Sequence, residues 1–326
     1  MWYLGDLKVE GRVILAPMAG VTSEGYRKYM NSFGCNLCYT EMVSDMGIIY
    51  ENKETEDYVK FEKDICPTGV QLFGNKPANL AKATVKCLSM NPNIAFIDVN
   101  MGCPVNKVTK AGSGSAIMKN PKLAGDIIRA IKEVTKLPVT AKIRLGFDEV
   151  NFPDVIKELE SAGVDAIAIH ARTRKELYYG VPHYELIENL QSKMKVPLIV
   201  SGNIFTVEDA LNALKITGAT AVMVARGGMG NPLLIKDIQD TLNGKEATSK
   251  YTFESQKQMC IELADSLIKE KGETIAMRIY RSIAPKFFSG FPNSKSLRVK
   301  LASQMTTYKS MLEILNDFEN TDMRDF

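Results

Sequence analysis

The sequence predicts an α/β fold: a TIM (β/α)8 barrel followed by a small C-terminal all-helical domain. Eight short apolar runs, each followed by a stretch with helical spacing, fill about 240 of the 326 residues, which matches such a barrel in number and length. The runs are apolar throughout, as expected for parallel strands covered by helices. A doubly wound sheet is the alternative, but eight regular units without an obvious topological break favour closure.

The predicted elements alternate strictly along the chain. Each strand is a short apolar run, and the strands are predicted at 13–16, 37–41, 69–74, 95–99, 138–143, 165–170, 197–200 and 221–225. Helices start at polar capping residues such as Ser44, Asn120 and Thr206, or at a proline in the first turn. The helices are predicted at 23–33, after Ser44, and at 77–90, 121–135, 152–162, 183–191, 206–216 and beyond 232.

A polar stretch at 243–250 separates the barrel pattern from the rest of the chain. Only helical patterns follow it, at 252–271, 274–288 and 294–317. We therefore predict two domains, a catalytic barrel over 1–245 and a helical domain over 246–326, which is an ordinary size for a small domain.

Composition excludes several classes of protein. With 45% hydrophobic and 24% charged residues, no long apolar run and no basic-then-apolar leader, we expect neither a membrane span nor a signal peptide. Six cysteines do not form a disulfide framework in a chain of this length, so we expect reduced thiols and a cytoplasmic location. We also expect a monomer.

Cysteines 35 and 38 could be read as a metal or redox pair. A zinc site needs about four ligands, however, and the sequence has no second such pair and only two histidines, His170 and His183, far away along the chain. We predict a buried strand at this position and no metal site.

The distribution of charge is more informative than the net charge of +3. The segment 276–309 contains no Asp or Glu, whereas solvated surfaces normally mix the two signs. It contains seven basic residues: Arg278, Arg281, Lys286, Lys295, Arg298, Lys300 and Lys309. This segment predicts contact with a polyanion.

Polar groups and backbone-exposing turns follow nearly every predicted strand. In a barrel, the ends of the strands and the loops after them form one rim, where the chemistry lies. These residues are Pro17, Met18, Ala19, Gln71, Asn100, Cys103, Lys142, His170, Gly202, Asn203 and Arg226 with the two glycines after it. One such residue carries little weight, but their convergence on one rim predicts a site.

The glycine turns at 202–203 and 226–230 precede helices, as phosphate-binding turns do in this fold, although they could also be simple tight turns. Together with the Gln71 amide, which could read the edge of a heteroaromatic ring, and the Lys142 cation, they suggest FMN. Lys142 could instead be a Schiff-base lysine or a locally paired buried charge, and His170 could be a core histidine. Cys103 could be a proton donor or a small buried thiol.

The chain resembles the tRNA-dihydrouridine synthases, flavoproteins that reduce uridines in tRNA. The most specific segments are A-P-M-A-G at 16–20 and D-V-N-M-G-C-P at 98–104. The similarity extends over nearly the whole chain and includes 14–22, 40–42, 71–74, 98–107, 112–116, 142–144, 170–174, 201–204 and 226–232. The family also pairs its barrel with a C-terminal helical RNA-binding domain.

The resemblance implies a role for each matching residue. FMN would be held by Pro17, Met18, Ala19, Gln71, Lys142, His170, Ser201, Gly202, Asn203, Ala225 and Arg226. NADPH would reduce FMN, the flavin would pass hydride to C6 of a flipped-out uridine, and Cys103 would protonate C5. Asn100 would help to seat the uracil. We further predict that the tRNA is bound by basic residues, namely Lys107, Lys110, Arg172, Arg278, Arg281, Lys295 and Arg298.

Four aromatic residues near the basic segment are candidates for base stacking, although core packing of a helical domain is the simpler explanation: Tyr280, Phe287, Phe288 and Phe291. Two alternative functions stay open. One is a flavin dehydrogenase acting on a free pyrimidine, of the dihydroorotate type, which would not need the acid-free segment. The other is a non-catalytic RNA-binding protein, which would not need Cys103, Lys142 and His170 together.

Overall fold

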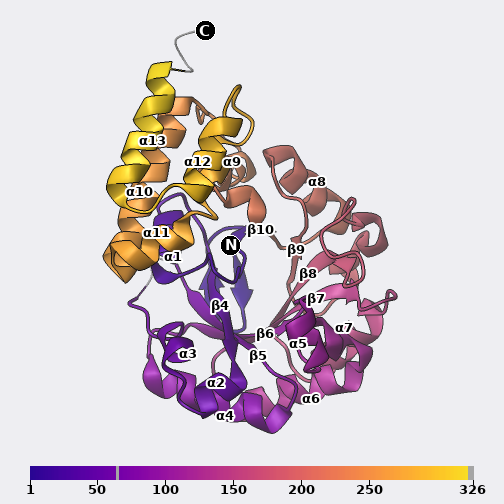
Figure 1. Cartoon of the computed structure of the whole chain (residues 1–326). Helices are drawn as coiled ribbons and strands as arrows, with labels where there is room; N and C mark the ends of the chain where they lie inside the picture. The colour runs from indigo at the N-terminus through magenta and orange to yellow at the C-terminus, as the bar shows by residue number, and fades with distance from the viewer. Residues whose placement is uncertain (64–65, 322–326) are drawn as a thin grey trace.

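A computed structural model describes residues 1–63 and 66–321, and within them eight parallel strands form one closed sheet (Figure 1). Their order is β3-β10-β9-β8-β7-β6-β5-β4. The sheet closes where the Leu15 backbone N–H donates to the Leu37 carbonyl at 3.0 Å, just before β4. The predicted TIM barrel is confirmed. Its strands are β3 (Val13–Leu15), β4 (Cys38–Ser44), β5 (Thr68–Phe73), β6 (Phe96–Met101), β7 (Val139–Gly146), β8 (Ala166–Thr173), β9 (Leu198–Ser201) and β10 (Ala221–Val224).

Helices cover the outside of the barrel and begin at the caps that the sequence indicated. The Asn120 side chain accepts from the Leu123 N–H, and Thr206 forms a reciprocal capping box with Asp209. The helices are α1 (Glu24–Asn31), α2 (Asp45–Ile49), α3 (Lys53–Asp57), α4 (Pro77–Met90), α5 (Asn106–Lys110), α6 (Pro121–Lys132), α7 (Phe152–Ser161), α8 (Val207–Thr217) and α9 (Leu233–Leu242).

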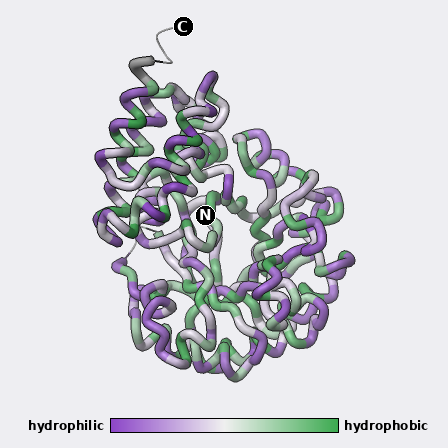
Figure 2. The backbone as a smooth tube through the Cα atoms, viewed as in Figure 1, coloured by the Kyte–Doolittle hydropathy of each residue, from purple (hydrophilic) through white to green (hydrophobic). Residues whose placement is uncertain are grey.

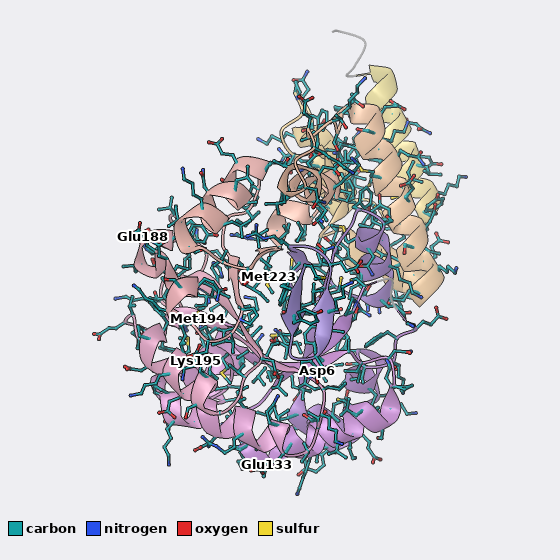
Figure 3. The ribbon with its side chains drawn as sticks, turned by 180° about the vertical axis from the view of Figure 1, so that it is seen from behind. Asp6, Glu133, Glu188, Met194, Lys195 and Met223 are labelled. Carbon is teal, nitrogen blue, oxygen red and sulfur yellow. The ribbon has the colours of Figure 1, made fainter. Side chains whose placement is uncertain are left out.

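Alternate side chains of each strand point to opposite sides of the sheet, which divides the apolar core in two. Val222 and Val224 of β10 face the helices, whereas Ala221 and Met223 belong to a second cluster inside the barrel. Seen from behind, Met223 lies near the centre of the ring of strands (Figure 3). The hydropathy tube shows the strands as mainly hydrophobic, with hydrophilic residues along the outer helices (Figure 2).

An N-terminal hairpin, which the sequence did not reveal, packs against the interior cluster. It pairs β1 (Trp2–Leu4) with β2 (Leu7–Val9), and Trp2, Leu4 and Val9 are buried in that cluster. A Cβ at Gly5 would lie 3.2 Å from Pro138, the residue just before β7, so the hairpin covers the N-terminal ends of the strands. A ligand must therefore enter at the opposite rim.

The predicted helix over 183–191 is wrong. Two short 3-10 helices, Tyr184–Ile187 and Leu190–Lys193, replace it. Between them Asn189 adopts a left-handed φ of 50°, and its N–H donates to the Ile216 carbonyl instead of to its own segment. The periodicity of the apolar residues concealed this break.

The C-terminal region is helical, as predicted, but two of its three predicted helices are interrupted. The predicted 274–288 helix ends at Tyr280 and resumes as a 3-10 helix that contains Pro285, which lacks a backbone N–H. The predicted 294–317 helix is divided at 304–307, where Thr307 and Ser310 exchange capping bonds. The elements are α10 (Phe253–Lys271), α11 (Glu273–Tyr280), the 3-10 helix Ala284–Phe288, α12 (Lys295–Ser303) and α13 (Tyr308–Thr321).

Helix α10 joins this region to the barrel through α1, beside which it lies in Figure 1. Glu270 accepts from the Ser23 hydroxyl and from the Gly25 N–H, both at 2.7 Å, and the Ser266 hydroxyl donates to the Gly25 carbonyl at 2.8 Å. A carboxylate that accepts two bonds at a helix N-terminus is a favourable contact. The helical region is thereby fixed against the first unit of the barrel.

Cys38 lies on β4, buried, with its sulfur 3.0 Å from the Asn31 Oδ1 and 3.2 Å from the Cys66 sulfur. Within the described part of the chain, no group of three or more His, Cys, Asp or Glu residues is arranged to hold a metal ion.

None of the described helices has the length and apolar character needed to cross a membrane.

Candidate active site at the barrel mouth

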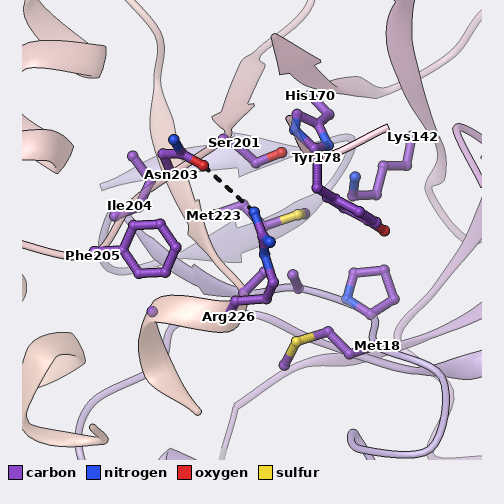
Figure 4. Close-up of a pocket in the computed structure, with 15 residues that line it drawn as sticks. Met18, Lys142, His170, Tyr178, Ser201, Asn203, Ile204, Phe205, Met223 and Arg226 are labelled. Carbon is purple, nitrogen blue, oxygen red and sulfur yellow. Dashed lines mark hydrogen bonds between the residues drawn. The ribbon is translucent and has the colours of Figure 1, made fainter. Parts of the chain in front are cut away.

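A cavity opens at the carboxyl ends of the strands, the rim that the hairpin leaves accessible (Figure 4). Residues at or just after the ends of β3, β9 and β10 line it together with residues of β7 and β8, although they lie more than two hundred positions apart in sequence. The lining residues are Ala16, Pro17, Met18, Lys142, His170, Tyr178, Ser201, Gly202, Asn203, Ile204, Phe205, Met223, Ala225, Arg226 and Gly227. Nine of the predicted site residues are thus brought together.

The lining is cationic. Lys142, His170 and Arg226 face the cavity, and no described lining residue is an Asp or Glu. Burial lowers the pKa of Lys142 to about 8, with Arg144 adding to the effect, while Asp98 and Cys103 act in the opposite direction. Confining cations without an acidic partner is unfavourable, so the cavity favours an anionic ligand.

His170 is neutral. Arg172 Nη1 lies 3.1 Å from His170 Nε2, and because a guanidinium can only donate, Nε2 must accept and the ring proton must lie on Nδ1. Burial, and then the charges of Arg144, Lys142, Arg172 and Arg226, lower the pKa of His170 well below its ordinary value. His170 therefore offers the cavity a neutral imidazole.

Two backbone turns form one wall of the cavity. Gly202 has a φ of 135° and Asn203 one of 47°, and the Asn203 Oδ1 lies 3.5 Å from Arg226 Nη2. In the second turn, a Cβ on Gly227 would lie 1.8 Å from the carbonyl oxygen of Ile204, so only glycine allows the two turns to approach. The two turns and Arg226 thus form one continuous wall of the cavity.

Tyr178 is a lining residue that sequence reasoning missed. Its ring lies 5.9 Å from the His170 ring, with the Arg226 and Arg144 guanidinium carbons at 4.6 and 5.4 Å from its centroid (Figure 4). It belongs to an irregular loop after β8, for which hydrophobic periodicity gives no signal. The neighbouring pair Tyr178-Tyr179 in a polar loop was the available indication.

Arg172 holds that loop. It is fully buried, and its Nε and Nη2 donate to the carbonyls of Tyr179 and Gly180 at 2.9 and 2.6 Å. The prediction that Arg172 binds the RNA is not supported by this position, because its nitrogens are engaged inside the barrel mouth. Its contacts with His170 and the loop make it a positioning residue.

Cys103 lies in a turn directly after β6, and the side chain of Asn100 supports that turn. The Asn100 Oδ1 accepts from the backbone N–H groups of Gly102 and Cys103, at 3.2 and 2.9 Å. Asn100 is in register with Lys142 on β7, which places the turn beside the cavity. Burial raises the pKa of the partly exposed Cys103 thiol, while the Val105 N–H and the Arg144 and Lys142 charges act in the opposite direction.

Gln71 and Ala19, both predicted to hold the cofactor, do not line the cavity. The Gln71 Nε2 donates to Asp98 at 2.6 Å, and its Oε1 accepts from Asn100 at 2.8 Å. Each of these contacts uses one hydrogen-bonding position of the amide, so only the remaining ones are available to a ring edge. Asn100 was predicted to seat the uracil, but its side-chain carbonyl accepts hydrogen bonds from the Cys103 turn.

The predicted RNA-binding residues fall into two groups. Lys107 and Lys110 are exposed on the short helix α5, and Arg278 and Lys295 are exposed on the helical region. Arg281 instead donates to the Met305 carbonyl at 2.6 Å, and the Arg298 Nε is buried. The first group is available to a polyanion, whereas Arg281 and Arg298 also contribute to packing.

Among the four aromatic candidates, Tyr280, Phe287 and Phe288 are buried in the core of the helical region, so the stacking prediction is wrong for them and core packing explains their presence. Phe291 is partly buried and lies edge-on to the Phe253 ring, 6.1 Å between centroids.

Comparisons with known proteins agree on one family. The model of the family described as "Dihydrouridine synthase (Dus)" matches residues 14–321. A probable tRNA-dihydrouridine synthase of Rickettsia conorii is 35% identical over 298 residues, which are 90% of this chain and 89% of that protein. A probable tRNA-dihydrouridine synthase 1 of Synechocystis sp. is 31% identical, over 91% of this chain and 84% of that protein. The tRNA-dihydrouridine synthase B of Pseudomonas aeruginosa is 30% identical, over 91% and 90%.

Among solved structures, the old yellow enzyme homologue from Zymomonas mobilis has a TM-score of 0.49 and 13% sequence identity, covering 77% of this chain and 94% of that chain. A similarity at this level carries no inference.

Replacing Gly227 by Ala should destabilise the protein strongly, because the new Cβ would overlap a backbone oxygen that cannot move without breaking the turn. We expect a loss of about 3 kcal/mol or more in the free energy of unfolding, measured by denaturant titration. Gly228→Ala is the matched control, since its Cβ would meet the flexible end of Met30 at 3.2 Å. We expect that variant to lose about 1 kcal/mol at most. Equal losses in the two variants would contradict the close approach at Gly227.

Proposed function

The chain belongs to the dihydrouridine synthase family, and on this premise we propose that it reduces the C5–C6 double bond of specific uridines in tRNA to 5,6-dihydrouridine. The observation that carries the proposal is the pairing of an acid-free cationic cavity with the Cys103 thiol beside it on one barrel rim. A cation-lined cavity suits an anionic redox cofactor, and the thiol is a source of a proton.

The residues of the cavity fit FMN. The turns at 201–203 and 225–228, with Arg226, offer backbone and charge to the phosphate, and the missing Cβ of Gly227 lets the second turn pack against Ile204. Lys142 offers a cation and His170 a neutral imidazole to the ring system, and the chains of Pro17 and Met18 offer it apolar contact. We propose that Ala19, Gln71, Ser201, Gly202, Asn203 and Ala225 complete the cofactor site.

Bound FMN, reduced by NADPH, would supply the hydride that adds to C6 of the uracil. The chain's own contribution is the proton for C5. The raised pKa of Cys103 keeps its thiol protonated at neutral pH, so the proton is present when it is needed. The thiolate left behind lies near the positive charges of Lys142 and Arg144, which stabilise it. General acid catalysis of this kind contributes about 10² to 10⁴ in rate.

The helical region, proposed to be a tRNA-binding domain over 246–326, would supply binding energy. A base inside a stacked stem cannot reach the bottom of a barrel mouth, and unstacking it costs a few kcal/mol. Phosphate contacts by exposed basic residues can offset that cost. Lys107 and Lys110 on the opposite side of the mouth would add contacts near Cys103. We further propose a monomer that acts in the cytoplasm, where tRNA and NADPH are found.

Cys103→Ala should retain bound flavin and the oxidation of NADPH but lose dihydrouridine formation by about 10²-fold or more, because only the proton donor is removed. Mass spectrometry of tRNA incubated with each variant measures the product. Cys87→Ala, on α4 and buried away from the mouth, controls for the loss of a thiol as such. Wild-type product formation by Cys103→Ala would remove Cys103 from the reaction.

FMN affinity should fall as the pH rises above about 8. The pKa of Lys142 in the free protein is lowered to about 8, and an anionic cofactor favours the ammonium form, so the interaction is complete below that pH and is lost above it. Fluorescence quenching from pH 6.5 to 9.5 measures the dissociation constant. Lys142→Met should bind more weakly at pH 7 and show no decline near pH 8. Lys136→Met, an exposed lysine before the same strand, should retain the wild-type profile. The same decline in Lys142→Met would exclude Lys142 as its origin.

Removing exposed basic residues of the helical region should weaken tRNA binding and flatten its dependence on salt. For each of Arg278→Ala, Lys295→Ala and Lys300→Ala we expect the slope of log K against log salt to decrease by about 0.7 to 0.9. Arg281 and Arg298 are left intact because both also support packing. Lys157→Ala on α7 (Figure 1) and Lys195→Ala (Figure 3), on the side of the barrel away from that region, serve as controls. Unchanged slopes in the first three variants would place the RNA elsewhere.

A further inference from the structure

A carboxylate that the proposed reaction does not use lies inside the barrel beneath the cavity. Asp98 of β6 is fully buried, and it is in register with Gln71 on β5 and Thr140 on β7. Its Oδ2 accepts from Gln71 Nε2 at 2.6 Å, and its Oδ1 accepts from the Thr140 hydroxyl at 2.5 Å. A buried carboxylate is costly unless it is hydrogen-bonded, so its presence inside the barrel requires a reason.

An ionised carboxylate can only accept hydrogen bonds, and this property fixes the donor-to-acceptor direction of the chain of hydrogen bonds that starts at Asp98. The Gln71 amide must turn its NH2 group toward Asp98, which leaves its carbonyl facing Asn100. Asn100 must then donate to Gln71, at 2.8 Å, and turn its own carbonyl outward. That carbonyl accepts from the N–H groups of Gly102 and Cys103, so the chain ends at the turn that carries the thiol.

We propose that Asp98 is a positioning residue: as an acceptor-only anchor, it orients the Gln71 and Asn100 amides and thereby holds the backbone turn that presents Cys103. The proposal deepens the proposed function and rests on it for its consequence, because the position of Cys103 matters to catalysis only if Cys103 is the proton donor.

The other hydrogen bonds of the Cys103 turn show what the hydrogen-bond chain from Asp98 adds to its support. Ser115 and Arg144 hold the carbonyls: the Ser115 hydroxyl donates to the Cys103 oxygen at 2.9 Å, and Arg144 Nε donates to the Gly102 oxygen at 2.8 Å. The chain from Asp98 holds the N–H groups of the same two residues. Both sides of the turn must be held to fix a side chain to within the fraction of an ångström that proton transfer requires.

The ionisation of Asp98 is consistent with this role. Burial raises its pKa to about 6, while the Thr140 and Gln71 donors and the charge of Lys142 act in the opposite direction. The carboxylate is therefore ionised at neutral pH and accepts only. Its charge also supports the ammonium of Lys142, so a test must separate the loss of charge from the loss of the acceptor.

Two variants of Asp98 make this separation. Asp98→Leu removes both the charge and the acceptor. Asp98→Asn removes the charge alone, because its carbonyl can still face Gln71 while its NH2 group donates to the Thr140 hydroxyl, which can accept as well as donate. Cys103 is partly exposed and the five other cysteines are buried, so iodoacetamide modifies Cys103 first, as peptide mapping can verify. The measurement is the rate of Cys103 alkylation in the flavin-free protein at neutral pH.

We expect Asp98→Leu to be alkylated about fivefold faster or more than Asp98→Asn, because the released turn opens locally, and Asp98→Asn to stay within about twofold of wild type. Thr140→Val removes the other bond to the same carboxylate but leaves the chain intact, and it should also stay within about twofold. Equal alkylation rates in Asp98→Leu and Asp98→Asn would overturn the proposal, whether both rates match wild type or both are accelerated.

If Asp98→Leu does not fold, Gln71→Met breaks the next link while keeping the Asp98 charge that supports Lys142. It should accelerate alkylation by the same factor, and a wild-type rate in this variant would overturn the proposal. Product formation on tRNA is the second measurement, and the released turn in Asp98→Leu should lower turnover. Alkylation involves no turnover, so a wild-type protein that forms no dihydrouridine would refute the proposed function and leave the alkylation contrast to decide the role of Asp98.

Discussion

Closure of a parallel sheet is the constraint on which the rest of this structure depends. Once β3 meets the residues before β4, the carboxyl ends of the strands lie on one rim, and the N-terminal hairpin covers the other. Residues that are far apart in the chain, such as Met18 and Arg226, then line one cavity without any local relation between them. The apolar runs of the strands build the barrel, and the point where each run ends decides which side chain reaches the rim.

The alternation of side chains also orders the interior into layers. Apolar residues such as Ala221 and Met223 fill it near the hairpin side and its middle, and polar residues enter only toward the mouth. There Asp98 and Thr140 form one layer, and Asn100 and Lys142 form the next. The buried acid thus lies beneath the cations. It supports the Lys142 charge from below without occupying the cavity, where it would repel an anionic ligand.

The parts of this arrangement that follow from local rules were predictable from the sequence. The continuous apolar runs of the strands and the caps at Asn120 and Thr206 depend on near neighbours, so they located the barrel and most of the lining residues. The break at Asn189 was not predictable, because its N–H is bound by Ile216 of a different unit. The position of Tyr178 in the cavity and the burial of Arg172 were not predicted for the same reason. Each depends on a loop whose path is determined by contacts across the mouth rather than by periodicity.

The concentration of positive charge at the mouth links the cavity, His170 and the Cys103 turn. Burial and the nearby charges of Arg144, Lys142 and Arg226 lower the pKa of His170. The mutual repulsion of these cations destabilises the folded protein when no anionic ligand is bound. A bound anion converts that cost into affinity, since each cation then gains a partner that is already in place. Burial raises the pKa of the Cys103 thiol, while the charges of Arg144 and Lys142 act in the opposite direction. The turn holds the sulfur in its partly buried position. On the proposed function, the support of that turn by Asn100 is as much a condition of the chemistry as the cations themselves.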